Sequence, residues 1–297
     1  GARLDKHNLV DHVIFSPRVN VRFNPSEAVN LRVSYAGGYR APQAFDEDMH
    51  IAIVGGKRVR IRLADDLREE RSHSVSLSAD LYHTFGKVQT NLLVEGFYTI
   101  LDDVFALRDM DDAADGGKVK ERYNGSGATV RGFNVEGRAA FTRWFELQAG
   151  VTLQQSRYKE PEFWSEDAEV PPVRRMFRTP DAYGYFTASF KPVRNFTADL
   201  SGTCTGSMLV QHMAGSGVAQ DVAVSTPSFF DMNVRLSYDL RIYKEITLQL
   251  YGGVQQLLRR AGGDVQDLFH GHPPYLSDFV VYSIVLRRRP VNAAGGV

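Results

Sequence analysis

The chain has 297 residues, of which 43% are apolar and 24% are charged, a composition that suits one large folded domain or two ordinary ones. Its 35 Lys and Arg residues balance its 35 Asp and Glu residues, so the charge gives no reason to expect nucleic acid as a partner. Cys204 is the only cysteine, which excludes an intrachain disulfide framework and a multi-cysteine zinc site.

Neither a transmembrane helix nor a signal peptide is visible in the sequence. No run approaches the roughly 18 consecutive apolar residues that a membrane-spanning helix needs. The N-terminus, residues 1–5, lacks the charged and apolar regions of a signal peptide. If the chain is exported, we expect its signal to have been removed or to lie upstream, which favours a fragment of a longer protein.

Apolar and polar residues alternate along much of the chain, most clearly in segments 29–35, 74–81, 145–154, 230–241 and 246–250. In the second segment, Val75, Leu77 and Leu81 fall on one face of a strand, whereas Ser76 and Asp80 fall on the other. A helix would mix these two sets. Since almost no segment has a 3.6-residue apolar stripe, the sequence predicts an all-β protein.

Short and long connections between these predicted strands alternate along the chain. Candidate tight turns are residues 24–27, 85–87, 142–144, 192–195 and 243–245. The longer polar or glycine-rich stretches are residues 37–71, 102–127, 159–181, 212–228 and 258–275. One end of the sheet should therefore carry short turns and the other end long loops, as in bacterial outer-membrane barrels.

Two fold classes produce many two-faced strands: a soluble sandwich or propeller, and an antiparallel transmembrane β-barrel. The barrel is favoured because several strands reach the 9 to 11 residues or so that cross a bilayer. Charges on the polar face suit a wet or plugged lumen better than a dry core: Asp80, Glu95, Glu136, Arg138, Asp199, Arg235 and Asp239. Aromatic residues such as Tyr35, Tyr98 and Trp144 lie near predicted strand ends, where membrane interfaces favour them.

Several blocks resemble TonB-dependent outer-membrane receptors. Residues 31–42 are similar to the family strand that ends in Gly-aromatic-Arg-Ala-Pro, and residues 45–50 look like the form common in Bacteroidota-type bacteria. Residues 66–72 resemble the family's Leu-Pro-Glu-Ser start of the next strand, with Glu69 in place of proline. Residues 124–136 are similar to a glycine-rich start of another family strand.

The resemblance implies a barrel of about 22 strands around a plug. At roughly 25 residues per strand and connection, this chain holds about 11 or 12 of them. We therefore expect residues 1–297 to be the C-terminal part of the barrel, with the plug domain absent. Residues 279–286 run into Arg287-Arg288-Arg289-Pro290 rather than ending on the family's aromatic residue, and a truncated or frameshifted gene would explain this departure.

The function that the resemblance implies is TonB-energised uptake of a scarce ligand across the outer membrane of a Gram-negative bacterium. An iron-siderophore or cobalamin would be typical, and a glycan or peptide is also compatible. Implied partners are outer-membrane lipid and lipopolysaccharide, the missing plug and barrel strands, and TonB through that plug. No cofactor and no enzymatic activity are expected. The alternative is a stand-alone pore or adhesin of about 12 strands.

Ligand contacts are expected on the long loops. Aromatic and basic residues that could hold a ring-containing or anionic ligand, or lipopolysaccharide, are Trp164, Arg174, Arg175 and Arg178. The family-like block contributes residues of unknown role: Gly38, Tyr39, Arg40, Ala41, Pro42, Asp46, Glu47, Asp48 and His50. The acidic runs at 46–48 and 109–115, and the pair His270 and His272, match no metal-site spacing, so solvated loops are favoured over a metal.

Overall fold

A computed structural model describes residues 1–43, 59–110, 118–165, 167, 169–215, 218–243, 246–261 and 279–288. Every regular element in these ranges is a β-strand, as the alternating pattern predicts. None of these segments forms a helix of the length and apolar character that crossing a membrane requires.

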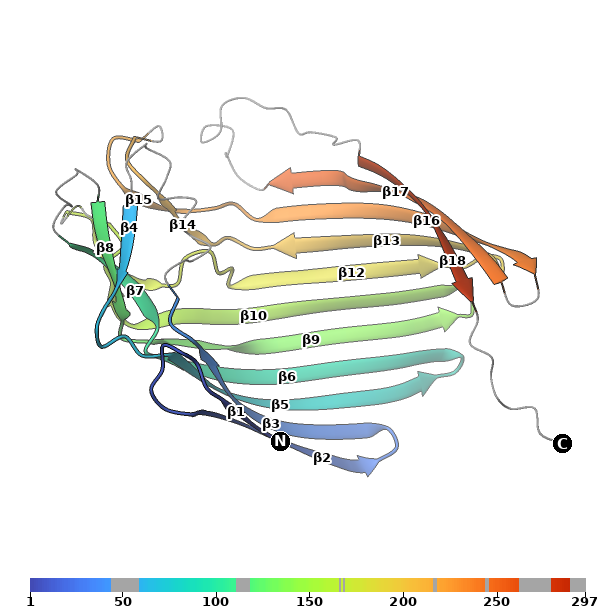
Figure 1. Ribbon diagram of the computed structural model, residues 1–297. Helices are drawn as coiled ribbons and strands as arrows, with labels where there is room; N and C mark the ends of the chain where they lie inside the picture. The colour runs from blue at the N-terminus through green and yellow to red at the C-terminus, as the bar shows by residue number, and fades with distance from the viewer. Residues whose placement is uncertain are drawn as a thin grey trace.

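One large antiparallel sheet contains most of the strands and curves into part of a barrel wall (Figure 1). Its strands, in spatial order, are β1 (Ala2–Asp5), β2 (Ile14–Ser26), β3 (Val29–Arg40), β5 (Glu70–Phe85), β6 (Val88–Asp102), β9 (Ala128–Thr142), β10 (Phe145–Glu162), β12 (Ala182–Phe190), β13 (Phe196–Thr205), β16 (Phe229–Tyr243), β17 (Ile246–Ala261) and β18 (Phe279–Arg288). Among the described strands, β1 and β18 end the sheet and do not pair with each other, so the barrel is open.

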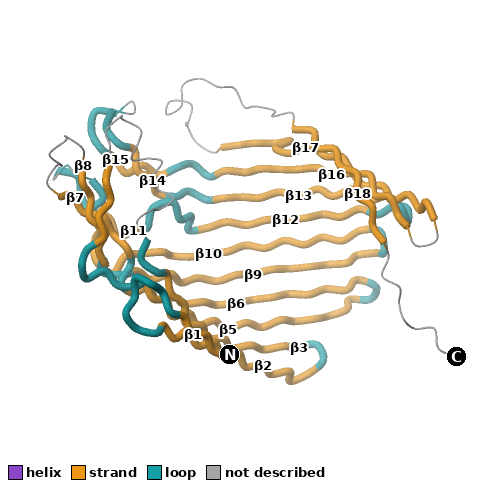
Figure 2. The backbone as a smooth tube through the Cα atoms, in the orientation of Figure 1, coloured by secondary structure: helices purple, strands orange, loops and turns teal. Residues whose placement is uncertain are grey.

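Smaller strands gather at one end of this sheet (Figures 1 and 2). A three-stranded sheet is formed by β4 (Val59–Leu63), β8 (Lys118–Asn124) and β7 (Phe105–Met110). A hairpin is formed by β14 (Leu209–His212) and β15 (Val222–Ser225), and the short β11 (Val173–Arg175) pairs with β10. Four of the stretches predicted as long loops, residues 37–71, 102–127, 159–181 and 212–228, therefore contain strands of their own and share one end of the wall as predicted. Most of the fifth stretch, from residue 262 onward, lies outside the described residues.

The opposite end carries the tight turns. Two-residue connections join β2 to β3, β5 to β6 and β9 to β10. The first turn was predicted at residues 24–27, but β2 continues to Ser26 and the turn follows it. The reason is a bulge between Phe23 and Ser26, which contains Pro25. Proline has no N–H to give to a ladder, so the pairing skips this position and resumes after it.

Register places apolar residues of neighbouring strands side by side on the outer face of the sheet. Directly opposed residues share a face, and one such row runs Val33, Leu77, Gly96, Phe133 and Leu153 across β3, β5, β6, β9 and β10. Leu77 and Phe133 are 59% and 64% exposed, so the described part of the chain leaves these side chains largely uncovered. A large exposed apolar surface on a continuous run of paired strands is typical of a lipid-facing barrel wall.

The inner face is polar and cross-linked by hydrogen bonds. Thr152 donates to Asn134 across β10 and β9 at 2.8 Å, and Arg138 contacts Glu146 at 2.5 Å. Ser189 donates to Asp199 across β12 and β13 at 2.6 Å. A face of this kind suits water or a polar plug, so it is the lumenal side of the wall.

Aromatic side chains mark both ends of the apolar outer band. At the turn end, the Trp144 and Phe190 rings meet edge-on at 5.3 Å, and Phe141 stacks on Phe145 at 5.5 Å. At the loop end, the Tyr35 hydroxyl lies 2.8 Å from the His73 ring nitrogen Nδ1. Aromatic residues at both ends of an apolar band are typical of the two membrane interfaces of a transmembrane barrel.

The two faces differ in their predicted tolerance of charge. Ala79, between Leu77 and Leu81 on the outer face, is in the middle of the apolar band, whereas neighbouring Ser78 faces the lumen. Ala79→Arg should lower the free energy of unfolding by about 2 to 4 kcal/mol, because arginine is costly at the bilayer midplane. Ser78→Arg is the size-matched control and should cost much less. Denaturant unfolding of the receptor in phospholipid vesicles measures both, and equal costs would contradict the assignment of faces.

Candidate ligand-binding loops and their polar base

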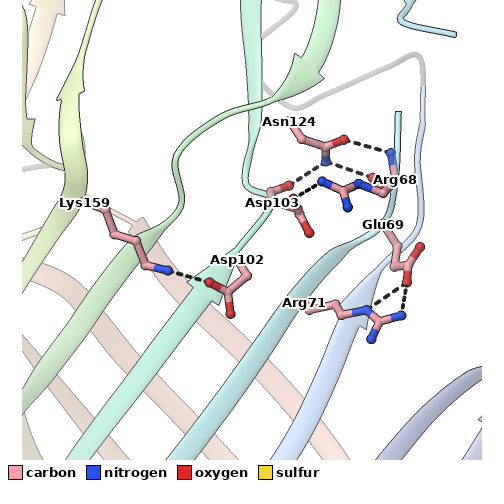
Figure 3. Close-up of polar contacts among 7 residues, drawn as sticks. All are labelled: Arg68, Glu69, Arg71, Asp102, Asp103, Asn124 and Lys159. Atoms are coloured by element: carbon pink, nitrogen blue, oxygen red, sulfur yellow. Dashed lines mark hydrogen bonds and ion pairs between the residues drawn. The ribbon is translucent and has the colours of Figure 1, made fainter. Parts of the chain in front are cut away.

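A cluster of charged and amide side chains joins the loops to the main sheet (Figure 3). We call it the loop-base cluster, and its members are Arg68, Glu69, Arg71, Asp102, Asp103, Asn124 and Lys159. They come from the segment before β5, the start of β5, the end of β6, the connection from β6 to β7, the end of β8 and the loop-side end of β10. Residues far apart in sequence therefore meet at the rim of the barrel wall.

Asn124 is the hub of one half of this cluster. Its side-chain oxygen accepts from the Arg68 backbone N–H at 2.8 Å, and its amide nitrogen donates to the backbone carbonyls of Arg68 at 3.0 Å and of Asp103 at 2.8 Å. The Arg68 guanidinium adds an ion pair with Asp103 at 2.9 Å. One amide thus holds three segments together, which fixes where β7 and β8 rise from the rim.

The glycines after Asn124 allow this close approach. Gly125 N–H donates to the Val104 carbonyl at 2.7 Å. Gly127 has a φ of 87°, in the region that favours glycine, and a Cβ there would lie against the Leu101 carbonyl oxygen. The Asn-Gly-Ser-Gly block that resembled a family strand start is therefore a structural junction.

The loop-base cluster also includes a carboxylate buried beside two basic groups. Glu69 is only 2% exposed and pairs with Arg71 at 2.7 Å and with His12 at 3.0 Å. Burial alone would raise the pKa of the Glu69 carboxyl, but hydrogen bonds from Arg71, from its own backbone N–H and from His12 outweigh burial and lower the pKa. Glu69 stands where the family has proline, and it fastens the segment before β2 to β5.

Two family-like blocks meet at Glu70. Its carboxylate accepts from the Phe105 backbone N–H at 2.5 Å and lies 3.6 Å from the Arg40 guanidinium. Arg40 also sits over the Phe105 ring, 5.6 Å from its centre. The family-like block of residues 31–42, which ends in Arg-Ala-Pro, and the block of residues 66–72 are thus joined through the start of β7.

The rest of the Arg-Ala-Pro block packs closely against its neighbours. A Cβ on Gly38 would lie 2.7 Å from the Ser72 hydroxyl oxygen, and Pro42 is buried. Tyr39 and Ala41 flank Arg40 and are half-buried. Asp46, Glu47, Asp48 and His50 lie outside the described residues, as do His270 and His272.

Above the rim, the small sheet of β4, β7 and β8 holds its own ion pairs. Arg108 bonds to Glu121 at 2.5 and 2.8 Å, and the hydrogen bond to Glu121 raises the pKa of the Arg108 guanidinium. Arg122 is 1% exposed and donates to the Gln43 carbonyl at 2.5 Å. A carboxylate and a guanidinium buried this way give the sheet a fixed shape, because leaving either unpaired would be costly.

The four residues predicted to bind ligand lie in the segment between β10 and β12. The Trp164 and Phe177 rings meet at 5.4 Å, and Trp164 is half-buried with its indole N–H unpaired. Arg175 is half-buried and lies opposite Arg157 of β10; it donates to the Ser207 carbonyl at 2.8 Å and pairs with Asp181 at 3.1 Å. Arg174 and Arg178 are exposed, and the Arg178 backbone donates to Leu209 at 2.7 Å.

This geometry can present aromatic rings and guanidinium groups on a firm base. Across the described ranges, no group of three or more His, Cys, Asp or Glu side chains is placed to hold a metal ion. Sequence reasoning singled out neither Asn124 as a hub nor His12 as a partner of Glu69. The Asn-Gly pair was a visible turn signal, whereas His12 lies 57 residues from Glu69 and gave none.

Removing the hub amide should loosen the loops and leave the wall intact. Asn124→Ala deletes three hydrogen bonds, so the opening free energy of β7 and β8 should fall by about 1 to 3 kcal/mol. Hydrogen exchange of those strands in the receptor measures it. Asn20→Ala, which deletes one exposed bond to Ser34, is the control. Unchanged exchange in β7 and β8 would show that Asn124 is not the hub.

The Glu69 contacts should depend on pH with a definite sign. Because the folded pKa of Glu69 is lowered, its contribution is present above the unfolded pKa and is lost as pH falls through the folded pKa. Exchange protection near His12 should therefore hold from neutral pH down to the ordinary carboxyl range and drop below it. Glu69→Gln should remove that dependence, and a variant that keeps the same acid transition would assign it elsewhere.

Comparison with known proteins places the chain in a family. Residues 1–255 match the family described as TonB dependent receptor-like, beta-barrel. No curated protein matches. Similar solved structures include the siderophore receptor PirA from Pseudomonas aeruginosa, at 14% identity and a TM-score of 0.59, covering 96% of this chain and 44% of that one.

Two further structures share the fold. A mutant of the ferric enterobactin receptor PfeA from Pseudomonas aeruginosa has 16% identity and a TM-score of 0.58, over 86% of this chain and 36% of that one. The copper transporter OprC has 11% identity and a TM-score of 0.54, over 83% and 34%. This chain thus spans less than half the length of each. The match over residues 1–255, together with the open antiparallel wall and its one-sided loops, shows that the chain belongs to the β-barrel family of TonB-dependent receptors.

Proposed function

We propose that this chain is part of an outer-membrane receptor that takes up a scarce ligand, with TonB supplying the energy. The observation that carries the proposal is the family match over residues 1–255, since the family consists of outer-membrane transport receptors of Gram-negative bacteria. The polar inner wall and the loops gathered at one end support it, because a transporter needs both a lumen and a capture surface.

We assign residues 1–297 to the barrel alone. The proposed receptor therefore also includes parts that do not belong to this chain. The open sheet has two edges, β1 and β18, whose backbone groups need partners in lipid. Further strands would close the wall, and a plug would fill the polar lumen and carry the contact with TonB. Outer-membrane lipid and lipopolysaccharide would surround the apolar face.

The loops and the names of the solved relatives support a proposal for the ligand class. PirA and PfeA are named as siderophore and ferric enterobactin receptors, and OprC as a copper transporter. A ferric siderophore is anionic and often carries aromatic rings, which suits an aromatic pair beside exposed arginines. We therefore propose an iron-siderophore, with cobalamin or a similar scarce ligand as the next choice, bound by Trp164, Arg174 and Arg178, while Arg175 positions the segment.

An uptake assay tests the ligand assignment. In cells whose receptor contains this chain, Trp164→Ala combined with Arg174→Ala should reduce uptake of the cognate radiolabelled ferric siderophore about tenfold or more, since both stacking and charge are lost. Arg143→Ala, in the tight turn at the opposite end, is the control and should leave uptake unchanged. Equal loss in both variants would remove these loop residues from the site.

The energy source has a separate test. Collapse of the proton gradient, or deletion of TonB, should abolish accumulation of the siderophore while leaving surface binding intact. Passive entry that survives both treatments would favour the alternative, a stand-alone pore of about 12 strands. Binding without any entry would favour an adhesin.

A further inference from the structure

A hollow of about 650 Å³ interrupts the outer face of the wall near its loop end. Gly96 forms its floor, because this position of β6 has no side chain in a row that is otherwise apolar. Leu77, Phe133 and Leu153 line it from β5, β9 and β10. A Cβ on Gly96 would already touch the Phe133 ring at 3.4 Å, so the hollow depends on the glycine.

The rim of the hollow on its loop side is polar. Tyr98 and Arg131 line it, and Arg131 donates to Gln155 at 2.9 Å. Register puts Arg131, Tyr98 and Gln155 in one row of the outer face, directly beyond the row of Gly96. Arg157, two residues after Gln155 on β10, is exposed on the same face.

These two arginines lack anionic partners. In the described part of the chain, neither Arg131 nor Arg157 has a carboxylate within ion-pairing distance, and Asp181, which also lines the hollow, is paired with Arg175 at 3.1 Å. Guanidinium groups at the edge of a hydrocarbon layer are costly without a counter-charge. Phosphate is the anion that membranes offer at this depth, and arginine binds it through two parallel hydrogen bonds.

We infer that the hollow holds an acyl chain of a phosphorylated lipid of the outer leaflet, lipopolysaccharide in a Gram-negative outer membrane, with its phosphate on Arg131 and Arg157. The apolar floor and walls accept the chain, and the arginines lie on the side where the head group must be. The orientation rests on the proposed function, which puts the long loops outside the cell. The lipid site itself is independent of which ligand the loops capture.

Retained lipid measures this site directly. The complete receptor containing this chain is purified from outer membranes in mild detergent, and native mass spectrometry counts the lipopolysaccharide that stays bound. Gly96→Leu, which fills the hollow, and the double variant Arg131→Gln with Arg157→Gln should each lower retention about tenfold. Gly137→Leu is the matched control, because Gly137 lies on the same face of β9, outside the hollow, with open space around its Cβ position.

Other outcomes overturn the site. Retention that is equal in all variants, or that falls as much in Gly137→Leu, would show that lipid binds the wall without using the hollow. A lipid without phosphate, or a second copy of the receptor in its place, would remove the role of the arginines. If Gly96→Leu fails to assemble, lipid retention in the double arginine variant tests the site by itself, since that variant changes only exposed side chains. Siderophore uptake should stay intact in each variant, which separates failure here from failure of the proposed function.

Discussion

Backbone hydrogen bonding is the constraint on which the rest of this structure depends. A chain that crosses lipid must satisfy every N–H and C=O internally, and for strands this requires an unbroken ladder of neighbours. The ladder here continues through twelve strands from β1 to β18, and each pairing is antiparallel. Successive side chains of a strand point to opposite faces, so the alternation of apolar and polar residues alone produces a lipid face and a lumenal face.

At the rim, polar contacts rather than apolar packing hold the large loops on the wall. A few polar residues there connect many segments. Asn124 joins three segments through one amide, Glu70 joins two family-like blocks, and Glu69 fastens the N-terminal segment to β5. The loops above therefore rest on a rim whose polar contacts hold its geometry, which agrees with recognition placed on a rigid scaffold.

The sequence predicted the fold because its strongest signal, alternation, is local. Segment 74–81 already separated Leu77 from Ser76, and the tight turns needed only short-range residues. The turn near Pro25 was displaced because the bulge depends on the partner strand. The loop-base cluster was not predictable, since Asn124 contacts Arg68 across 56 residues. The hollow at Gly96 was hidden for the same reason: its walls belong to three other strands.

The most direct test of the membrane-spanning wall is the accessibility of spin labels placed one residue apart. With Cys204 replaced by serine, single labels at Val94, Glu95, Asn134 and Val135 are compared in receptor reconstituted into lipid. Collisions with dissolved oxygen should be high at Val94 and Val135, and collisions with a water-soluble nickel complex should be high at Glu95 and Asn134. Accessibility that does not alternate along β6 and β9, with oxygen and nickel equal at all four sites, would contradict a wall with lipid on one face and an aqueous lumen on the other.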